Sequence, residues 1–71
     1  ICHGPQLLIE ADLVKGRTAT SHRAIRTDMV NAGANFEDHG VVREGNLITA
    51  QGVQDISAFM KKIIDVLKVP A

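Results

Sequence analysis

The apolar residues of this 71-residue chain recur with spacings that predict a series of helices and short strands. From Pro5 to Val14, apolar side chains cover almost the whole circumference of a helix turned at about 100° per residue. Pro5 suits the first helical position, and Gly16 suits a left-handed stop after the last one. We therefore expect a short helix that is buried on most sides.

A strand and a second helix are expected next along the chain. The β-branched and small residues of segment 17–21 favour one short strand. Ser21 suits the N-cap of a helix that ends at Gly33, and the polar residues of this helix predict one solvent-facing side. Its apolar positions recur at helical spacing, with Met29 at a core position: Ile25, Met29 and Ala32.

The second half of the chain predicts a hairpin followed by an amphipathic helix. The apolar runs 41–42 and 47–49 flank the turn-forming Glu44-Gly45-Asn46, which is typical of two antiparallel strands. The helix is expected from about Val53 to about Lys68. The apolar positions that we expect to face the core are Ile56, Phe59, Met60, Ile63 and Leu67.

Alternating helices and short strands indicate an α/β layered architecture. Such sheets usually hold several strands with helices on both faces, whereas the first expected helix here has no strand before it. The chain is shorter than an average domain and leaves room for one small core. We expect residues 1–71 to be the C-terminal portion of a domain, with the N-terminal half of its sheet absent from this sequence.

Composition excludes several classes of function. The 8 basic side chains balance 8 acidic ones, so the chain offers no electrostatic reason to bind nucleic acid or an anionic membrane. No window approaches the roughly 20 apolar residues of a membrane span. The single cysteine, Cys2, cannot form an internal disulfide, which favours a reducing compartment. A soluble, cytoplasmic protein is the resulting expectation.

The candidate chemical site is Cys2-His3-Gly4-Pro5. An apolar residue, a sharp glycine-containing turn and a helix start in this order are the layout of a nucleophile elbow. In such a turn, backbone N–H groups stabilise a thiolate and an oxyanion, and a glycine permits the close turn. The alternative interpretation is that Cys2 is a small buried apolar residue, as many lone cysteines are.

Five segments of the chain form a pattern more specific than the elbow alone. They are Ile-Cys-His-Gly-Pro-Gln-Leu-Leu-Ile at 1–9, Lys-Gly-Arg-Thr at 15–18, Ile-Arg-Thr-Asp-Met at 25–29, Asn-Ala-Gly-Ala at 31–34 and Val-Val-Arg-Glu-Gly-Asn-Leu-Ile-Thr at 41–49. Taken in this order, they resemble the C-terminal part of the ThiJ/PfpI superfamily, especially its PfpI-type intracellular proteases. The resemblance spans nearly the whole chain.

The resemblance implies a flavodoxin-like three-layer α/β/α domain, shared with class I glutamine amidotransferases, whose C-terminal half begins here at the nucleophile elbow. It implies that Cys2 is the nucleophile and that His3, which directly follows it, is the partner of the thiolate. The backbone N–H of His3 matches an oxyanion donor, and Gly4 is assigned to substrate binding.

Further members of the site follow from the same resemblance. The family also uses a glutamate from the N-terminal half, which no residue here matches, and Glu10 follows the elbow and cannot supply it. His22 falls where the parkinsonism-associated deglycase branch has a histidine near the nucleophile, whereas protease-type members usually carry Ser-Tyr-Pro there. His22 is therefore either a second catalytic candidate beside His3 or an exposed residue at a helix start. His39 is expected in solvent, and the cysteine and histidines lack the spacing of a metal site.

These residues predict a cysteine-dependent hydrolase or a deglycase/glyoxalase-like stress-response enzyme that acts on peptides or reactive carbonyl compounds. The alternatives are a redox-sensing chaperone that uses the same cysteine without catalysis, or an inactive fragment. We expect no cofactor and no metal, and the family implies a homo-oligomer, dimeric or higher. Segment 48–56 lacks the histidine of a glutaminase triad, so no release of ammonia from glutamine is expected.

Overall fold

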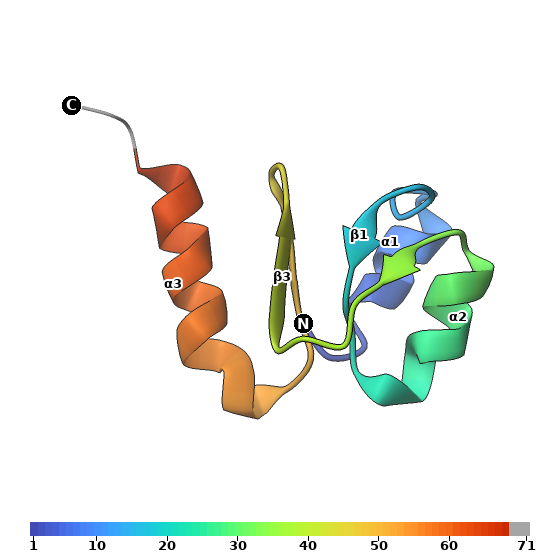
Figure 1. Ribbon diagram of the computed structural model, residues 1–71, viewed down its shortest axis with the longest axis horizontal. Helices are drawn as coiled ribbons and strands as arrows, with labels where there is room; N and C mark the ends of the chain where they lie inside the picture. The colour runs from blue at the N-terminus through green and yellow to red at the C-terminus, as the bar shows by residue number, and fades with distance from the viewer. Residues whose placement is uncertain (69–71) are drawn as a thin grey trace.

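The computed structural model describes residues 1–68 of the chain. The helices and strands of these residues are α1 (Pro5–Glu10), β1 (Thr18–Ala19), α2 (Arg26–Asn31), β2 (Asn35–Phe36), β3 (Val41–Glu44), β4 (Leu47–Ala50) and α3 (Ile56–Leu67). Two 3₁₀ turns, η1 (Arg23–Ile25) and η2 (Val53–Asp55), lead into α2 and α3. Figure 1 shows α3 on one side of the hairpin that contains β3, with α1 and α2 on the other side. The chain is a mixed α/β structure, as the sequence predicts.

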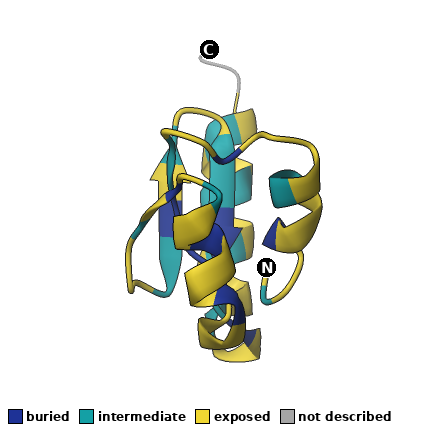
Figure 2. Ribbon diagram, turned by 90° about the vertical axis from the view of Figure 1, so that its right-hand side faces the viewer, coloured by how far each residue is buried: buried dark blue, intermediate teal, exposed yellow. Residues whose placement is uncertain are grey.

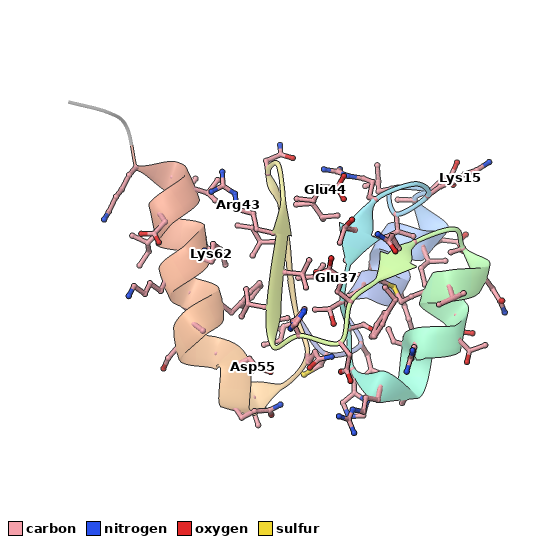
Figure 3. All side chains as sticks on the ribbon, in the orientation of Figure 1. Lys15, Glu37, Arg43, Glu44, Asp55 and Lys62 are labelled. Atoms are coloured by element: carbon pink, nitrogen blue, oxygen red, sulfur yellow. The ribbon has the colours of Figure 1, made fainter. Side chains whose placement is uncertain are left out.

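The strands of the described residues form two separate pairs. β1 and β2 are parallel, with Thr18 opposite Asn35, and β3 and β4 are antiparallel, with Val42 opposite Thr49. The hairpin is tied to β1 by Glu44, whose carboxylate accepts a hydrogen bond from the Thr18 N–H. Figure 3 shows the Glu44 side chain between the hairpin and β1. A second tie is the 2.9 Å hydrogen bond that the N–H of Thr20 donates to Thr49 Oγ1.

One small apolar core lies between α1, α2 and the β1–β2 pair. Its buried members are Val14, Ala19, Ile25, Met29 and Ala34. Met29 is fully buried, which confirms the expectation that it packs in the core. Leu8, Ile9 and Phe36 pack against this cluster while staying half-exposed. The core packs α1, which follows the Cys2 turn, against α2 and β1.

The first helix is shorter and more exposed than the sequence pattern predicts. α1 ends at Glu10 because Asp12 takes a left-handed conformation with φ of 57°, and the Leu13 N–H then bonds to the Leu8 carbonyl at 2.9 Å. Gly16 is therefore not its stop. Leu7 is 78% exposed and Leu13 51% exposed, so the expectation of a helix buried on most sides is wrong for the described residues.

The start of the second helical segment also differs from the prediction. His22, not Ser21, is the cap of η1, because its ring Nδ1 accepts a 3.0 Å hydrogen bond from the Ala24 N–H. The Ser21 hydroxyl is buried and donates to the His22 carbonyl instead. The sequence pattern also gave no sign of β2, whose two residues are ordered by their pairing with β1.

The hairpin and the last helix are both present as predicted. The burial predicted for the apolar face of the last helix is only partly found. Gly45 has φ of 58° in the hairpin turn, and α3 lies within the expected range. Phe59 and Ile63 are half-buried, whereas no residue of α3 is fully buried. In Figure 2, large parts of the helices are coloured as exposed. The expectation that the whole apolar face lies in a core is wrong for three residues: Ile56, Met60 and Leu67.

We expect the isolated 71-residue chain not to fold cooperatively as a monomer. Each sheet has two strands, which alone are marginally stable, and large apolar side chains of α3 stay in water. The buried Thr20 hydroxyl also lacks a hydrogen-bond partner among residues 1–68, which adds a cost of about 1–3 kcal/mol. Thermal unfolding followed by circular dichroism should show no sigmoidal transition. A sigmoidal transition of a monomer, with sedimentation confirming its mass, contradicts this expectation.

Candidate functional site

Cys2 occupies a tight turn directly before α1. Its φ is 56°, in the left-handed region that a residue with a side chain rarely adopts, and the Gly4 N–H closes the turn on the Ile1 carbonyl at 2.9 Å. A Cβ at Gly4 would lie 3.0 Å from this carbonyl oxygen, so glycine suits the corner. Strain of this kind at a candidate nucleophile is typical of functional sites. The described part of the chain has no strand before this turn, since Ile1 is its first residue.

Backbone hydrogen bonds fix Cys2 between two segments far from it in the sequence. The Cys2 N–H donates to the carbonyl of Ala50, at the end of β4, at 3.1 Å. The Cys2 carbonyl accepts from the His22 N–H at 2.8 Å. The thiol is free and half-buried, which differs from the alternative of a fully buried apolar cysteine. The turn before α1, the end of β4 and the start of η1 therefore meet at Cys2.

The two candidate histidines come together beside Cys2. The ring centroids of His3 and His22 are 4.7 Å apart, and the ring planes make an angle of 21°, so the rings stack. His3 follows Cys2 in the turn, and His22 is bonded to the Cys2 carbonyl through its backbone. The sequence suggested both residues as candidates, but nothing in it indicated their contact.

The hydrogen bonds of the two rings distinguish them. His22 Nδ1 accepts from the Ala24 N–H at 3.0 Å, so this nitrogen carries no proton and the neutral ring holds its proton on Nε2. The ring of His3 takes part in no hydrogen bond among residues 1–68, and the His3 N–H is likewise without an acceptor there. His3 thus has both ring nitrogens and a backbone donor available to a bound molecule.

A shallow depression opens next to His22. Its volume is about 220 Å³, and it is lined by His22, Arg23, Gln51, Gly52 and Gln54. Gln51 and Gly52 directly follow Ala50, the residue that accepts the Cys2 N–H. The depression is therefore adjacent to the turn that holds the thiol. Nothing in the sequence indicates a role for Gln51 or Gln54, because only the fold brings the end of β4 to His22.

Asp38 borders this depression through two polar contacts. The Gln51 side-chain amide donates to Asp38 Oδ1 at 2.8 Å, and the Arg23 guanidinium lies 3.8 Å from Asp38 Oδ2. The hydrogen bond from Gln51 and then the positive charge of Arg23 lower the pKa of the Asp38 carboxyl below its ordinary value. Both contacts stabilise the ionised form.

We expect Gln51→Ala to raise the pKa of Asp38 toward its ordinary value. In the native protein the lowered pKa means that the ionised carboxylate stabilises the fold above about pH 4, and this contribution is lost on acidification through the folded-state pKa. NMR titration of the carboxyl carbon in the whole protein measures the shift. An unchanged midpoint in Gln51→Ala, or a native midpoint above the ordinary value, contradicts this assignment.

Other features of the described residues that could have formed a functional site lie away from Cys2 or do not form a site. A larger, more open hollow of about 440 Å³ is lined by residues of α1 and α2 together with Ala32, and the cysteine and histidines do not contribute to it. His39 is exposed in the loop before β3, as expected. In the part of the chain that the structure describes, no three side chains of His, Cys, Asp or Glu gather as metal ligands. No helix within residues 1–68 is long and apolar enough to cross a bilayer.

A mixed α/β fold with a cysteine in a strained turn before a helix defines a class of protein, and comparison identifies the family. The model of the DJ-1/PfpI family matches residues 1–66, so the chain belongs to this family. This confirms the resemblance that the five sequence segments indicated. Solved structures agree: DJ-1 of Schizosaccharomyces pombe is 28% identical, with a TM-score of 0.87, over 96% of this chain and 35% of that protein. The match confirms a partial flavodoxin-like α/β fold.

Two further relatives show how much of the family the chain represents. Deglycase PfpI of Pyrococcus furiosus is 46% identical over 68 residues, which are 96% of this chain and 41% of that protein. YraA of Bacillus subtilis, named as a candidate cysteine protease, is 47% identical over 96% of this chain and 40% of its own length. The chain therefore spans about two fifths of the length of the curated relatives that it matches.

Proposed function

We propose that the whole protein is a cysteine-dependent hydrolase or deglycase that acts on peptides or reactive carbonyl compounds. The observation that carries this proposal is the left-handed turn at Cys2, with the stacked rings of His3 and His22 beside it. Membership of the DJ-1/PfpI family supports it, as do relatives named as a deglycase and a candidate cysteine protease.

For a peptide or other acyl substrate, the proposed reaction has two steps. The Cys2 thiolate attacks the carbonyl carbon, a C–S bond forms, and an electron pair moves to the carbonyl oxygen. The free N–H of His3 stabilises this oxygen, and the His3 ring gives a proton to the leaving amine as the C–N bond breaks. Water, deprotonated by His3, then hydrolyses the thioester, which releases the acid and restores the thiolate.

For a dicarbonyl compound such as methylglyoxal, the same groups perform an internal redox reaction. The thiolate adds to the aldehyde carbon to give a hemithioacetal. His3 moves a proton from this carbon to the neighbouring carbon through an enediol, so that the first carbon is oxidised to a thioester and the ketone is reduced to an alcohol. Hydrolysis of the thioester yields a 2-hydroxy acid without any external oxidant or reductant.

We assign the proton transfers to His3 and a positioning role to His22. His22 Nδ1 is occupied by the Ala24 N–H, so the ring cannot accept a proton there without losing its cap. Its face supports the ring of His3 at a centroid distance of 4.7 Å. The ring nitrogens of His3 form no hydrogen bond among residues 1–68, so both are available for proton transfer. Gly4, at the corner of the same turn, borders the proposed substrate position.

We further propose that the whole protein forms a homo-oligomer. A glutamate from outside these 71 residues is proposed to complete the site at Cys2. Glu10 lies at the end of α1 beyond the turn, so we do not propose it as the glutamate that the family places near its cysteine. The chain is proposed to be the C-terminal portion of the catalytic domain, which needs no metal or cofactor for either reaction above.

The test is a substrate panel with the whole protein. Turnover of methylglyoxal, of a glycated amino acid or of an amidated peptide supports the proposal, and glutamine serves as a control from which we expect no ammonia. Mass spectrometry after mild peroxide is measured in parallel. Selective addition of two oxygens to Cys2, with negligible turnover of every carbonyl substrate, overturns the enzymatic proposal in favour of a redox-sensing protein.

A further inference from the structure

We infer that the depression beside His22 binds the carboxylate of a substrate, and that Arg23 determines this specificity. The inference rests on the proposed function and extends it to a substrate class. The substrate is a short peptide, or an amino-acid adduct, whose free α-carboxylate lies about one residue beyond the carbonyl that Cys2 attacks.

The first argument is the position of the depression. It shares His22 with the Cys2 site, and His22 is both stacked on His3 and bonded to the Cys2 carbonyl. Its lining also includes Gln51, which directly follows Ala50, the residue that accepts the Cys2 N–H. A substrate with its reacting carbonyl at Cys2 therefore has this depression as its neighbouring space.

The second argument is the size and shape of the space. Its volume of about 220 Å³ lies below the roughly 300–1,000 Å³ of pockets for larger ligands, so it suits about one amino-acid residue. Gly52 is buried in its wall, and the Gln54 side-chain oxygen lies 2.6 Å from where a Cβ of residue 52 would stand. Only glycine at position 52 leaves the Gln54 side chain in this place.

The third argument is charge. Arg23 is the one cation among the five lining residues, and none of the five is acidic. Within residues 1–68, the Arg23 guanidinium donates no hydrogen bond and has one ion-pair contact, to Asp38 at 3.8 Å, with the Arg23 side chain 81% exposed. This contact is longer than a charge-assisted hydrogen bond, and exposed ion pairs are weak. The guanidinium is thus available to a carboxylate, which it can hold with two parallel N–H bonds.

The side-chain amide groups of the depression are already engaged in hydrogen bonds, which leaves Arg23 as the donor for a ligand. The Gln51 amide is engaged by Asp38 at 2.8 Å, and the Gln54 amide is engaged by Asp55 at 3.1 Å. Both glutamines are therefore held by carboxylates outside the depression, and Arg23 remains as its charged donor. A neutral carboxamide offers this donor a weaker acceptor than a carboxylate does.

The experiment compares two peptides of identical sequence, one ending in a free carboxylate and the other in a carboxamide. The whole protein and its Arg23→Gln variant are assayed on both, with Arg43→Gln as a matched control at an exposed arginine of the hairpin. In the native protein we expect the KM of the carboxylate peptide to be about tenfold lower than that of the carboxamide. Arg23→Gln should remove this difference by raising the KM of the carboxylate peptide more than that of the carboxamide, while Arg43→Gln should preserve it.

Equal KM values for the two peptides in the native protein, or an equal rise for both in Arg23→Gln, overturn the inference. If neither peptide is turned over, the peptidase part of the proposed function fails instead, and equilibrium binding decides the inference. Calorimetry then measures the binding of each peptide to two variants of the whole protein, Cys2→Ala and the double variant Cys2→Ala with Arg23→Gln. The inference is supported if Cys2→Ala binds the carboxylate peptide more tightly than the carboxamide and the double variant does not. Equal binding of the two peptides to Cys2→Ala overturns it.

Discussion

We expect Cys2→Ala to lower kcat/KM of the whole protein on carbonyl substrates by about 10³-fold or more. The substitution removes the sulfur atom that forms the covalent bond to the substrate in the proposed mechanism. The fold should survive, because Cys2 is held through backbone N–H and carbonyl groups that alanine retains, although alanine must adopt the same φ of 56°. Steady-state kinetics with methylglyoxal and with an amidated peptide measure the effect.

Cys2→Ser is the second variant for this prediction. Serine keeps the size and a polar atom but is a far weaker nucleophile near neutral pH, so we expect a loss close to that of alanine. Circular dichroism of both variants separates loss of chemistry from loss of structure. If both variants are folded and turn over substrate at the native rate, Cys2 is not the nucleophile and the proposed mechanism is wrong.

The second large effect is expected at His3. His3→Gln removes the proton carrier and should lower kcat/KM by about 10²- to 10⁴-fold. His22→Asn is its counterpart, because asparagine can cap η1 as the His22 ring does and removes only the stacked ring. Loss of a stacking contact of about 0.5–1.5 kcal/mol corresponds to a decrease of roughly 2- to 12-fold.

His39→Gln is the matched control for these two variants. His39 is an exposed histidine in the loop before β3 and does not line the depression, so its replacement should leave kcat/KM unchanged. Equal losses for the two variants would contradict the roles assigned to the two histidines, and a larger loss for His22→Asn would reverse them.

The features that could be predicted from the sequence are those with local causes. The hairpin follows from Gly45, which takes φ of 58° in its turn, and the long apolar period of α3 predicts its range. The candidate nucleophile was recognisable because glycine and proline follow the cysteine at the spacing of a turn before a helix. Met29 was predicted to be buried for a similar reason, since it lies on the apolar side of a short helix.

The features that could not be predicted depend on distant parts of the chain. The exposure of Leu7 and Met60 is set by which neighbours are present, and periodicity reports only which face is apolar. The two-residue strand β2 exists through its pairing with β1. The cap made by His22 was missed because serine is the more usual capping residue, whereas the histidine ring reaches the Ala24 N–H only in this local conformation.

The depression next to His22 is another feature that could not be predicted from the sequence. Arg23 is close to His22 in the sequence, but Gln51 and Gln54 reach the same place only because β4 ends beside the Cys2 turn. No spacing rule connects residues 23 and 51. A contact map, or an alignment showing the two positions changing together, is the kind of signal that would have joined them.

Trapping of the covalent intermediate tests the central claim most directly. The whole protein is mixed with an amidated peptide or with methylglyoxal, quenched in acid during turnover, digested and analysed by mass spectrometry. The account predicts that the mass of the acyl or 2-hydroxyacyl group is added to the peptide that contains Cys2, and that this adduct is absent from Cys2→Ala. Turnover that proceeds with unmodified Cys2, or with the adduct on another residue, would contradict the account.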